Sequence, residues 1–238
     1  MGMLQAGVSL VPFHAPERRR AAIELSVLGS LSGGFLALFP RRPIVVDLGL
    51  ALFALSLVLL SAGHTRARFW GQCSVQGRRT GRDSLLVTMA LTLLVILCFG
   101  LTGGVIGYQG ADWPGVKARL LHPYIPTAIL LYVPWAFLQQ TLFQFYLLGR
   151  VRALWPFLPP VAHSALNGMI FGLVHTADIW IALPAALGGT LWSYLYLRDR
   201  RLWPLALSHA LIGTTFYYWV YGYDLAGRWS GFFRSLMS

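Results

Sequence analysis

The chain has 238 residues, of which 56% are hydrophobic and 11% are charged, against roughly 25% charged residues in a typical soluble domain. This composition excludes a water-soluble globule and a disordered chain, and the presence of only two cysteines excludes a disulfide scaffold. The net charge of +11 would indicate nucleic acid in a soluble protein, but here short basic segments separate apolar runs, so we predict contact with anionic lipid headgroups and no nucleic-acid partner.

The apolar runs predict an all-α, polytopic transmembrane helix bundle. A spanning helix needs about 20 apolar residues. We expect about seven spans, which cover residues 21–39, 44–62, 84–108, 124–148, 161–175, 179–197 and 202–221. With a cytoplasmic N-terminus, about two thirds of the basic residues fall on the cytoplasmic side. This distribution predicts that orientation, in a bacterial inner membrane.

The sequence divides into four parts on this hydropathy pattern. They are a basic cytoplasmic lead-in (1–20), three N-terminal spans (21–122), a core of four spans (123–222) and a C-terminal tail (223–238). The first two spans each carry one acid, Glu24 and Asp47, near a predicted end. We interpret both as interfacial or paired carboxylates, because a buried unpaired charge is expensive in a membrane.

The fourth predicted span carries three glutamines within six residues, Gln139, Gln140 and Gln144. Gln140 and Gln144 are four residues apart and share a helix face. Each amide brings two donors and an acceptor that need partners in an apolar setting. One interpretation is hydrogen bonding that holds the bundle together, and the other is a polar site.

The fifth and seventh predicted spans each carry a histidine inside apolar sequence. Phe171 and His175 are four residues apart, and Asn167 lies within about 80° of His175 around a helix. His209 stands in the seventh span, four residues before Gly213. A lone buried histidine is often structural, but two histidines on separate helices and a glutamine cluster on a third predict a shared polar site.

These segments, in this order, resemble the CPBP family of CAAX proteases and bacteriocin-processing enzymes, also called the Abi family. The family's second motif, Phe-x-x-x-His, is intact as Phe171 to His175. Its third motif, His-x-x-x-Asn or Asp, keeps His209 but has Gly213 at the last position. The resemblance covers about residues 124–221, and it implies a polytopic intramembrane endopeptidase.

The first family motif, Glu-Glu-x-x-x-Arg, is altered at every diagnostic position. Gln139 and Gln140 stand for the two glutamates, and Gln144 stands for the arginine. In the family a glutamate, assisted by histidine, is thought to activate water for attack on a peptide carbonyl. A carboxamide cannot act as that base near neutral pH and can only orient water or donate to an oxyanion.

Two outcomes follow from this altered motif. In an active variant, His175 or His209 is the general base and Gln139 and Gln140 position water. The supporting residues in that case are Gln144, Phe171, Asn167 and Gly213. The alternative is an inactive pseudoprotease that serves as a membrane scaffold or immunity-type binding protein. A small-solute transporter is disfavoured, because the number of spans is odd and no repeat is visible.

The resemblance also implies the partner and the cofactor requirement. The expected substrate is a membrane-associated peptide or protein. We predict no cofactor, and a divalent metal held by the two histidines and glutamine oxygens is the minor alternative, because no third strong ligand is visible.

Overall fold

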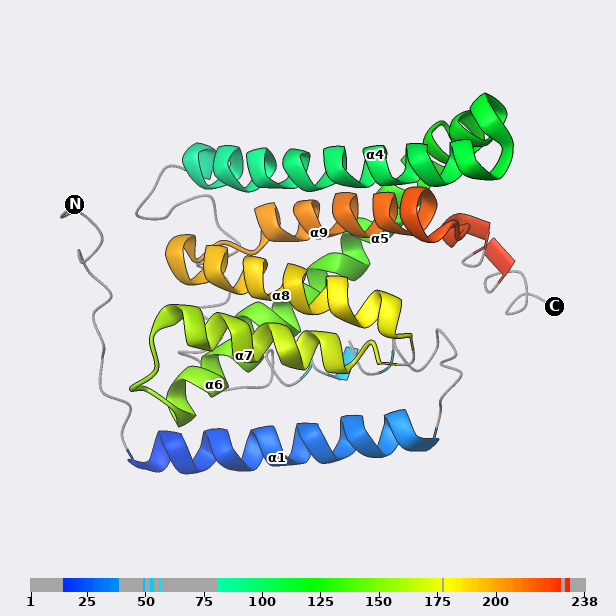
Figure 1. Cartoon of the computed structure of the whole chain (residues 1–238). Helices are drawn as coiled ribbons and strands as arrows, with labels where there is room; N and C mark the ends of the chain where they lie inside the picture. Colours follow the sequence, from blue (N-terminus) through cyan, green and yellow to red (C-terminus); the bar gives the residue numbers. More distant parts are fainter. Residues whose placement is uncertain are drawn as a thin grey trace. The chain divides into compact units, whose positions relative to one another are not determined.

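The described part of the chain is built from helices (Figure 1). The computed structural model describes residues 15–38, 49, 52, 53, 56, 81–176, 178–227 and 230–231. No strand occurs among these residues, which confirms the predicted all-α class. The predicted second span (44–62) falls outside the described residues except for those four isolated positions, and Asp47 lies outside them.

The chain forms two units, each assembled from two stretches of sequence. The first unit comprises Met1–Arg41 and Tyr146–Tyr194, and the second comprises Arg42–Phe145 and Leu195–Ser238. The division of the sequence into a lead-in, two groups of spans and a tail stays a prediction.

The described residues of the first unit form α1 (Ala15–Leu38), the last two residues of η1 (Thr141–Leu147), α6 (Leu148–Leu154), α7 (Pro160–Leu173) and the part of α8 (Ile179–Asp199) that ends at Tyr194. Helix α1 packs against α6, and α6 packs against α7. Pro160 is the first residue of α7, a position where the missing N–H of proline removes no helical hydrogen bond.

Glu24 connects α1 to the segment that leads into α6. Its carboxylate accepts a hydrogen bond from the Tyr146 hydroxyl at 2.8 Å and is also paired with the Arg150 guanidinium. Arg20, one helical turn earlier on α1, contacts the other carboxylate oxygen at 2.7 Å. Of the two interpretations of Glu24, interfacial or paired, the structure shows the paired carboxylate.

The second unit contains most of the remaining elements. They are α4 (Gly81–Leu120), α5 (Ile125–Gln140), the start of η1 (Thr141–Leu147), α9 (Trp203–Thr215) and η2 (Phe216–Tyr221). Both α4 and α5 pack against α9, and α4 also packs against η2. Helix α4 breaks at Ala111 and Asp112, where the backbone leaves the helical conformation.

Two segments of the described part of the chain are π-helical. Helix α5 continues directly into η1 at Thr141, and α9 continues directly into η2 at Phe216. A π-helical turn holds one more residue than an α-helical turn, so it changes the face on which the following side chains lie, and such turns are frequent at functional sites. The sequence predicted plain helices at both places.

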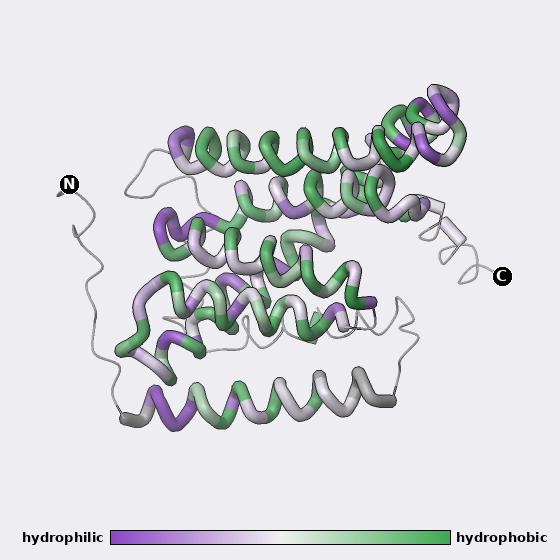
Figure 2. The backbone as a smooth tube through the Cα atoms, in the orientation of Figure 1, coloured by the Kyte–Doolittle hydropathy of each residue, from purple (hydrophilic) through white to green (hydrophobic). Residues whose placement is uncertain are grey.

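The polarity of α4 is inverted relative to a helix on a soluble protein. Ser84, Thr88 and Thr92 follow one another at intervals of four and are buried, whereas Leu97 and Leu101 are 57% and 74% exposed. In Figure 2 the tube of α4 is hydrophobic or neutral along most of its length, with hydrophilic residues gathered at its ends. A polar inner face and an apolar outer face suit a helix surrounded by lipid.

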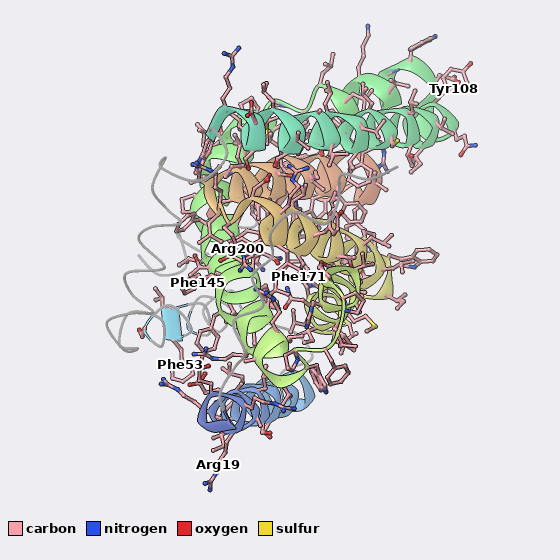
Figure 3. The ribbon with its side chains drawn as sticks, turned by 90° about the vertical axis from the view of Figure 1, so that its left-hand side faces the viewer. Arg19, Phe53, Tyr108, Phe145, Phe171 and Arg200 are labelled. Atoms are coloured by element: carbon pink, nitrogen blue, oxygen red, sulfur yellow. The ribbon has the colours of Figure 1, made fainter. Side chains whose placement is uncertain are left out.

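One helix among the described residues, Arg82–Leu120, is long and apolar enough to cross a membrane. The predicted spans 161–175, 179–197 and 202–221 coincide within a few residues with α7, α8 and the α9–η2 segment. The arrangement of about seven spans stays a prediction. In the first unit, the side chain of Arg19 points away from α1 (Figure 3).

Candidate functional site

One face of α5 contacts α9 and leads to the glutamine cluster. The buried residues of α5 recur every fourth position, at Ala128, Tyr132, Ala136 and Gln140. Residues with this spacing lie on one side of a helix, and the small alanines between the larger side chains let α9 approach closely. Gln140 is the last residue of α5 and is 1% exposed.

Gln140 and His209 meet across the contact between α5 and α9. The amide nitrogen Nε2 of Gln140 lies 3.2 Å from Nδ1 of His209, and both side chains are buried. When the amide N–H donates, Nδ1 is the acceptor and the proton of a neutral His209 sits on Nε2. In this tautomer His209 presents an N–H donor; rotating the amide by 180° would reverse the roles.

Two glutamine carbonyl oxygens at the end of α5 are buried acceptors. Oε1 of Gln140 and Oε1 of Gln139 are both buried and have no hydrogen-bond partner within the described residues. An unsatisfied buried acceptor costs about 1–3 kcal/mol, so a water or a substrate N–H bound there would relieve that penalty. Gln144, one turn further along, is fully buried and lies in η1 rather than on the α-helix.

His175 lies in the first unit, just beyond the end of α7. Helix α7 ends at Leu173, and the backbone N–H of His175 donates to the carbonyl of Gly172 at 2.8 Å. Nδ1 of His175 lies 2.7 Å from the backbone carbonyl oxygen of Phe171. Because a carbonyl only accepts, Nδ1 must carry the proton, and Nε2 of the neutral ring is therefore an acceptor.

Phe171 is fixed by close packing of α7 on α8. Its ring meets the Trp192 ring edge-on at 6.0 Å between centroids and lies 4.9 Å from the His175 ring. A Cβ at Gly189 would come within 2.9 Å of Cβ of Phe171, so only glycine allows this approach. Phe171, labelled in Figure 3, is 2% exposed.

Asn167 is part of the same α7–α8 contact. Its Nδ2 donates to Oγ of Ser193 at 2.9 Å, and that hydroxyl donates to the Gly189 carbonyl at 2.6 Å. Both side chains are buried, so this chain of hydrogen bonds fixes α7 against α8. Asn167 thus contributes to the position of the segment that carries Phe171 and His175.

Part of the chain resembles a known family of proteins. Residues 121–215 match the family model described as type II CAAX prenyl endopeptidase Rce1-like. This segment is similar to the CAAX protease family. The matched segment is about two fifths of the chain and contains every candidate site residue discussed above. No curated protein and no solved structure matches the chain.

The CAAX-protease-like segment is therefore the part of the chain in which protease chemistry must be sought. Its candidate residues fall into two groups. Gln139, Gln140, Gln144, His209 and Gly213 belong to the second unit, and Asn167, Phe171 and His175 belong to the first. The structure brings Gln140 and His209 into contact, and the meeting of His175 with that pair stays a prediction.

Sequence reasoning missed one neighbour of this site. The ring of Tyr132 meets the ring of His209 edge-on at 5.6 Å between centroids. The fourfold spacing of buried residues on α5 is the signal that could have found it, since it puts Tyr132 on the same face as Gln140. Among the described residues no group of three His, Cys, Asp or Glu could hold a metal ion, so the suggested divalent ion stays untested.

Proposed function

We propose that this chain is an intramembrane endopeptidase of the CAAX-protease-like class that cleaves a membrane-associated protein or peptide. The observation that carries the proposal is the buried contact of 3.2 Å between Gln140 and His209. It joins the altered first motif to the third motif, on two helices that are adjacent only after folding. The family match supports the class of reaction.

The two histidines have different roles in this proposal because their Nδ1 atoms have different partners. Nδ1 of His175 donates to a carbonyl, which leaves Nε2 able to take a proton from water. Nδ1 of His209 accepts from Gln140, which leaves Nε2–H able to donate to an oxyanion. We therefore assign His175 as the general base and His209 as the oxyanion donor.

The reaction then needs no carboxylate on α5. Nε2 of His175 takes a proton from a water molecule, and the hydroxide oxygen bonds to the peptide carbonyl carbon. The carbonyl oxygen gains the negative charge and accepts the hydrogen bond from His209. When the C–N bond breaks, His175 returns the proton to the leaving amine. Gln139 and Gln140 hold the water through their carbonyl oxygens.

The location proposed for this reaction is the interior of a polytopic bundle of about seven spans. The inverted polarity of α4 supports a lipid environment, since its buried face is hydroxyl-bearing and its exposed face is leucine-rich. The lead-in up to Arg20 would be cytoplasmic, and the membrane would be the bacterial inner membrane. The basic segments between helices would then contact anionic headgroups.

Purified protein in detergent or lipid nanodiscs tests the proposal directly. The substrate is a fluorogenic peptide with a lipid anchor, and the variant is Gln140→Glu. A glutamate at 140 can accept a proton from water, and it can pair with a doubly protonated His209 whose Nε2–H still donates to the oxyanion. We therefore expect turnover to rise by about 10²–10⁴-fold over the wild type. Gln109→Glu, on the exposed surface of α4, is the matched control and should change nothing. No cleavage by either the wild type or Gln140→Glu contradicts the proposal.

The second candidate is a pseudoprotease that binds a membrane partner without cleaving it. The absence of an acid on α5 and η1 favours it, because the family's base is missing while the contact between Gln140 and His209 is kept. This candidate predicts that a peptide probe still binds after His175→Ala. The endopeptidase predicts that binding persists but cleavage is lost.

A further inference from the structure

Gly213 stands four residues after His209 on α9, and its missing side chain leaves room for Tyr132. A Cβ at position 213 would lie 2.7 Å from Cε1 of Tyr132 and 3.4 Å from its hydroxyl oxygen. The first distance is too short for any side chain while the tyrosine keeps its place. The phenol of α5 therefore occupies the space that a side chain at position 213 of α9 would need.

Tyr132 also belongs to the surroundings of the buried pair. It is 8% exposed, and its ring is edge-on to His209. It shares the inner face of α5 with Gln140, and Ala136 lies between them as the small residue of that face. Since positions 209 and 213 are one helical turn apart, the phenol hydroxyl lies about one turn of α9 from His209.

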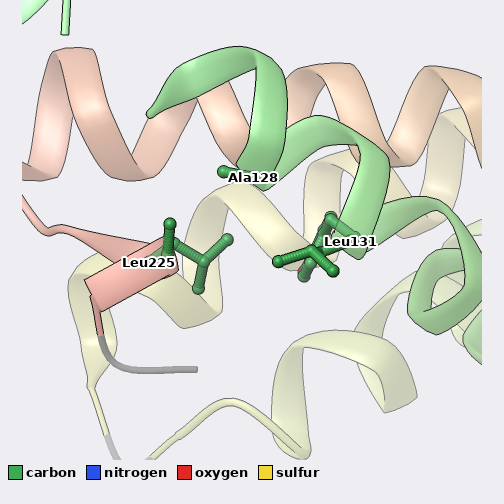
Figure 4. A pocket seen from close by; sticks show the side chains of 5 residues that line it. Ala128, Leu131 and Leu225 are labelled. Carbon is green, nitrogen blue, oxygen red and sulfur yellow. The ribbon is translucent and has the colours of Figure 1, made fainter. Parts of the chain in front are cut away.

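The other side of Tyr132 lines a small pocket (Figure 4). The pocket is formed by Ala128, Leu131, Tyr132, Leu225 and Ala226, and its walls other than the tyrosine are aliphatic. Tyr132 thus contacts the ring of His209 and also belongs to this aliphatic lining.

From this geometry we propose that Tyr132 is a further substrate-contacting residue of the site, and that its hydroxyl donates a hydrogen bond to the carbonyl oxygen of the bound peptide. The inference rests on the proposed endopeptidase function. Together, the Tyr132 O–H and the His209 Nε2–H provide two donors for the oxyanion. Donors fixed in a buried site act in a low dielectric and need no reorganisation when charge develops on the carbonyl oxygen.

The deciding experiment removes only the hydroxyl. In purified full-length protein, Tyr132→Phe should lower kcat by about 10²–10³-fold while KM stays within about twofold, because the hydrogen bond is strongest in the transition state. Tyr108→Phe, at an exposed position of α4, is the matched control. An unchanged kcat in Tyr132→Phe overturns the inference and leaves the tyrosine as packing alone.

Thermal unfolding tests whether Tyr132 and a side chain at position 213 compete for the same space, and this measurement requires no enzymatic activity. Gly213→Ala and Tyr132→Ala should each lower the melting temperature, the first by a clash and the second by a cavity. The double variant Tyr132→Ala, Gly213→Asn should lose less than the sum of Tyr132→Ala and Gly213→Asn, because the two residues compete for one volume. Additive losses would contradict the shared space at Gly213 on which the inference is built.

Failure of this inference is distinct from failure of the proposed function. If wild type and Gln140→Glu cleave the peptide and Tyr132→Phe cleaves it equally well, only the role of Tyr132 is wrong. If no variant cleaves, the endopeptidase proposal fails and the substrate role of Tyr132 fails with it. A non-additive stability result in that case assigns the ring to packing beside Gly213.

Discussion

The two units of the chain hold their histidines by different means. In the first unit, His175 is oriented by the carbonyl of Phe171, four residues earlier in the same segment. In the second, His209 is oriented by Gln140, which is 69 residues away in sequence. The local contact needs only backbone geometry, whereas the distant one needs α5 and α9 to be packed correctly. The comparison teaches that the intact motif fixes its histidine locally and the altered motifs fix theirs through tertiary structure.

The largest effect should come from the histidine assigned as base. His175→Ala removes the group that accepts a proton from water, so we expect cleavage to fall by about 10²–10⁴-fold. Folding should be kept, because the side chain lies beyond the end of α7 and is only partly buried. The rate is measured with the lipid-anchored peptide, and His14→Ala in the lead-in is the control. Cleavage that survives His175→Ala would transfer the role of base to His209.

The next effect concerns the glycine contacts that fix the first unit. A Cβ at Gly168 would lie 2.6 Å from the carbonyl oxygen of Ala186 on α8, so Gly168→Ala should force the helices apart. Overpacking of this kind costs about 1–3 kcal/mol and should lower the melting temperature by several degrees. Gly149→Ala is the matched control, because nothing lies within 4 Å of a Cβ there. Equal melting temperatures for the two variants would contradict the close packing of α7 on α8.

A smaller loss of stability is expected from the ion pair of α1. Glu24→Gln keeps the shape of the side chain but removes the charge that faces Arg150 and Arg20. Hydrogen bonds to charged groups contribute about 1.5–3 kcal/mol, and partial exposure of this cluster places the expected loss near the lower value. Thermal unfolding in detergent measures it, with Glu17→Gln on the exposed start of α1 as the control. A gain in peptidase activity instead of a loss of stability would give Glu24 a role other than structural.

The apolar runs located α1, α4, α5, α7, α8 and α9 to within several residues, but they did not predict the short α6 or the part of α4 beyond residue 108. The four-residue spacing of Gly168 and Gly172 is typical of small residues at helix interfaces, and both glycines lie against α8. Patterns of this kind depend on composition along one helix. The pairing of Glu24 is one of the two outcomes expected from the high energy of an unpaired carboxylate in an apolar setting.

The rest depends on contacts between segments that are distant in sequence. The π-helical register after Gln140 has no sequence signal, because it is a choice of hydrogen-bond partner rather than of residue type. Tyr132 was missed for a related reason, since a tyrosine in an apolar helix is typical of core packing. Its place beside the candidate site becomes visible only when α9 is packed on α5 and Gly213 lies against the tyrosine ring.

The smallest expected effect is a pH dependence at the C-terminal end of the second unit. Burial tends to raise the pKa of Asp224, but hydrogen bonds from the Gly227 backbone N–H at 2.9 Å and the Tyr218 hydroxyl at 2.7 Å outweigh it and lower that pKa below its ordinary value. A carboxyl with a lowered pKa stabilises the fold above its unfolded-state pKa, and the contribution is lost as the pH falls through the lowered value. Asp224→Asn should therefore reduce the melting temperature slightly at neutral pH and converge with the wild type in acid. A difference between the two proteins that grows as the pH falls would have the wrong sign, and would show that these hydrogen bonds do not hold the carboxylate. Because Asp224 is exposed, solvent screening keeps this effect below those expected at Gly168 and Glu24.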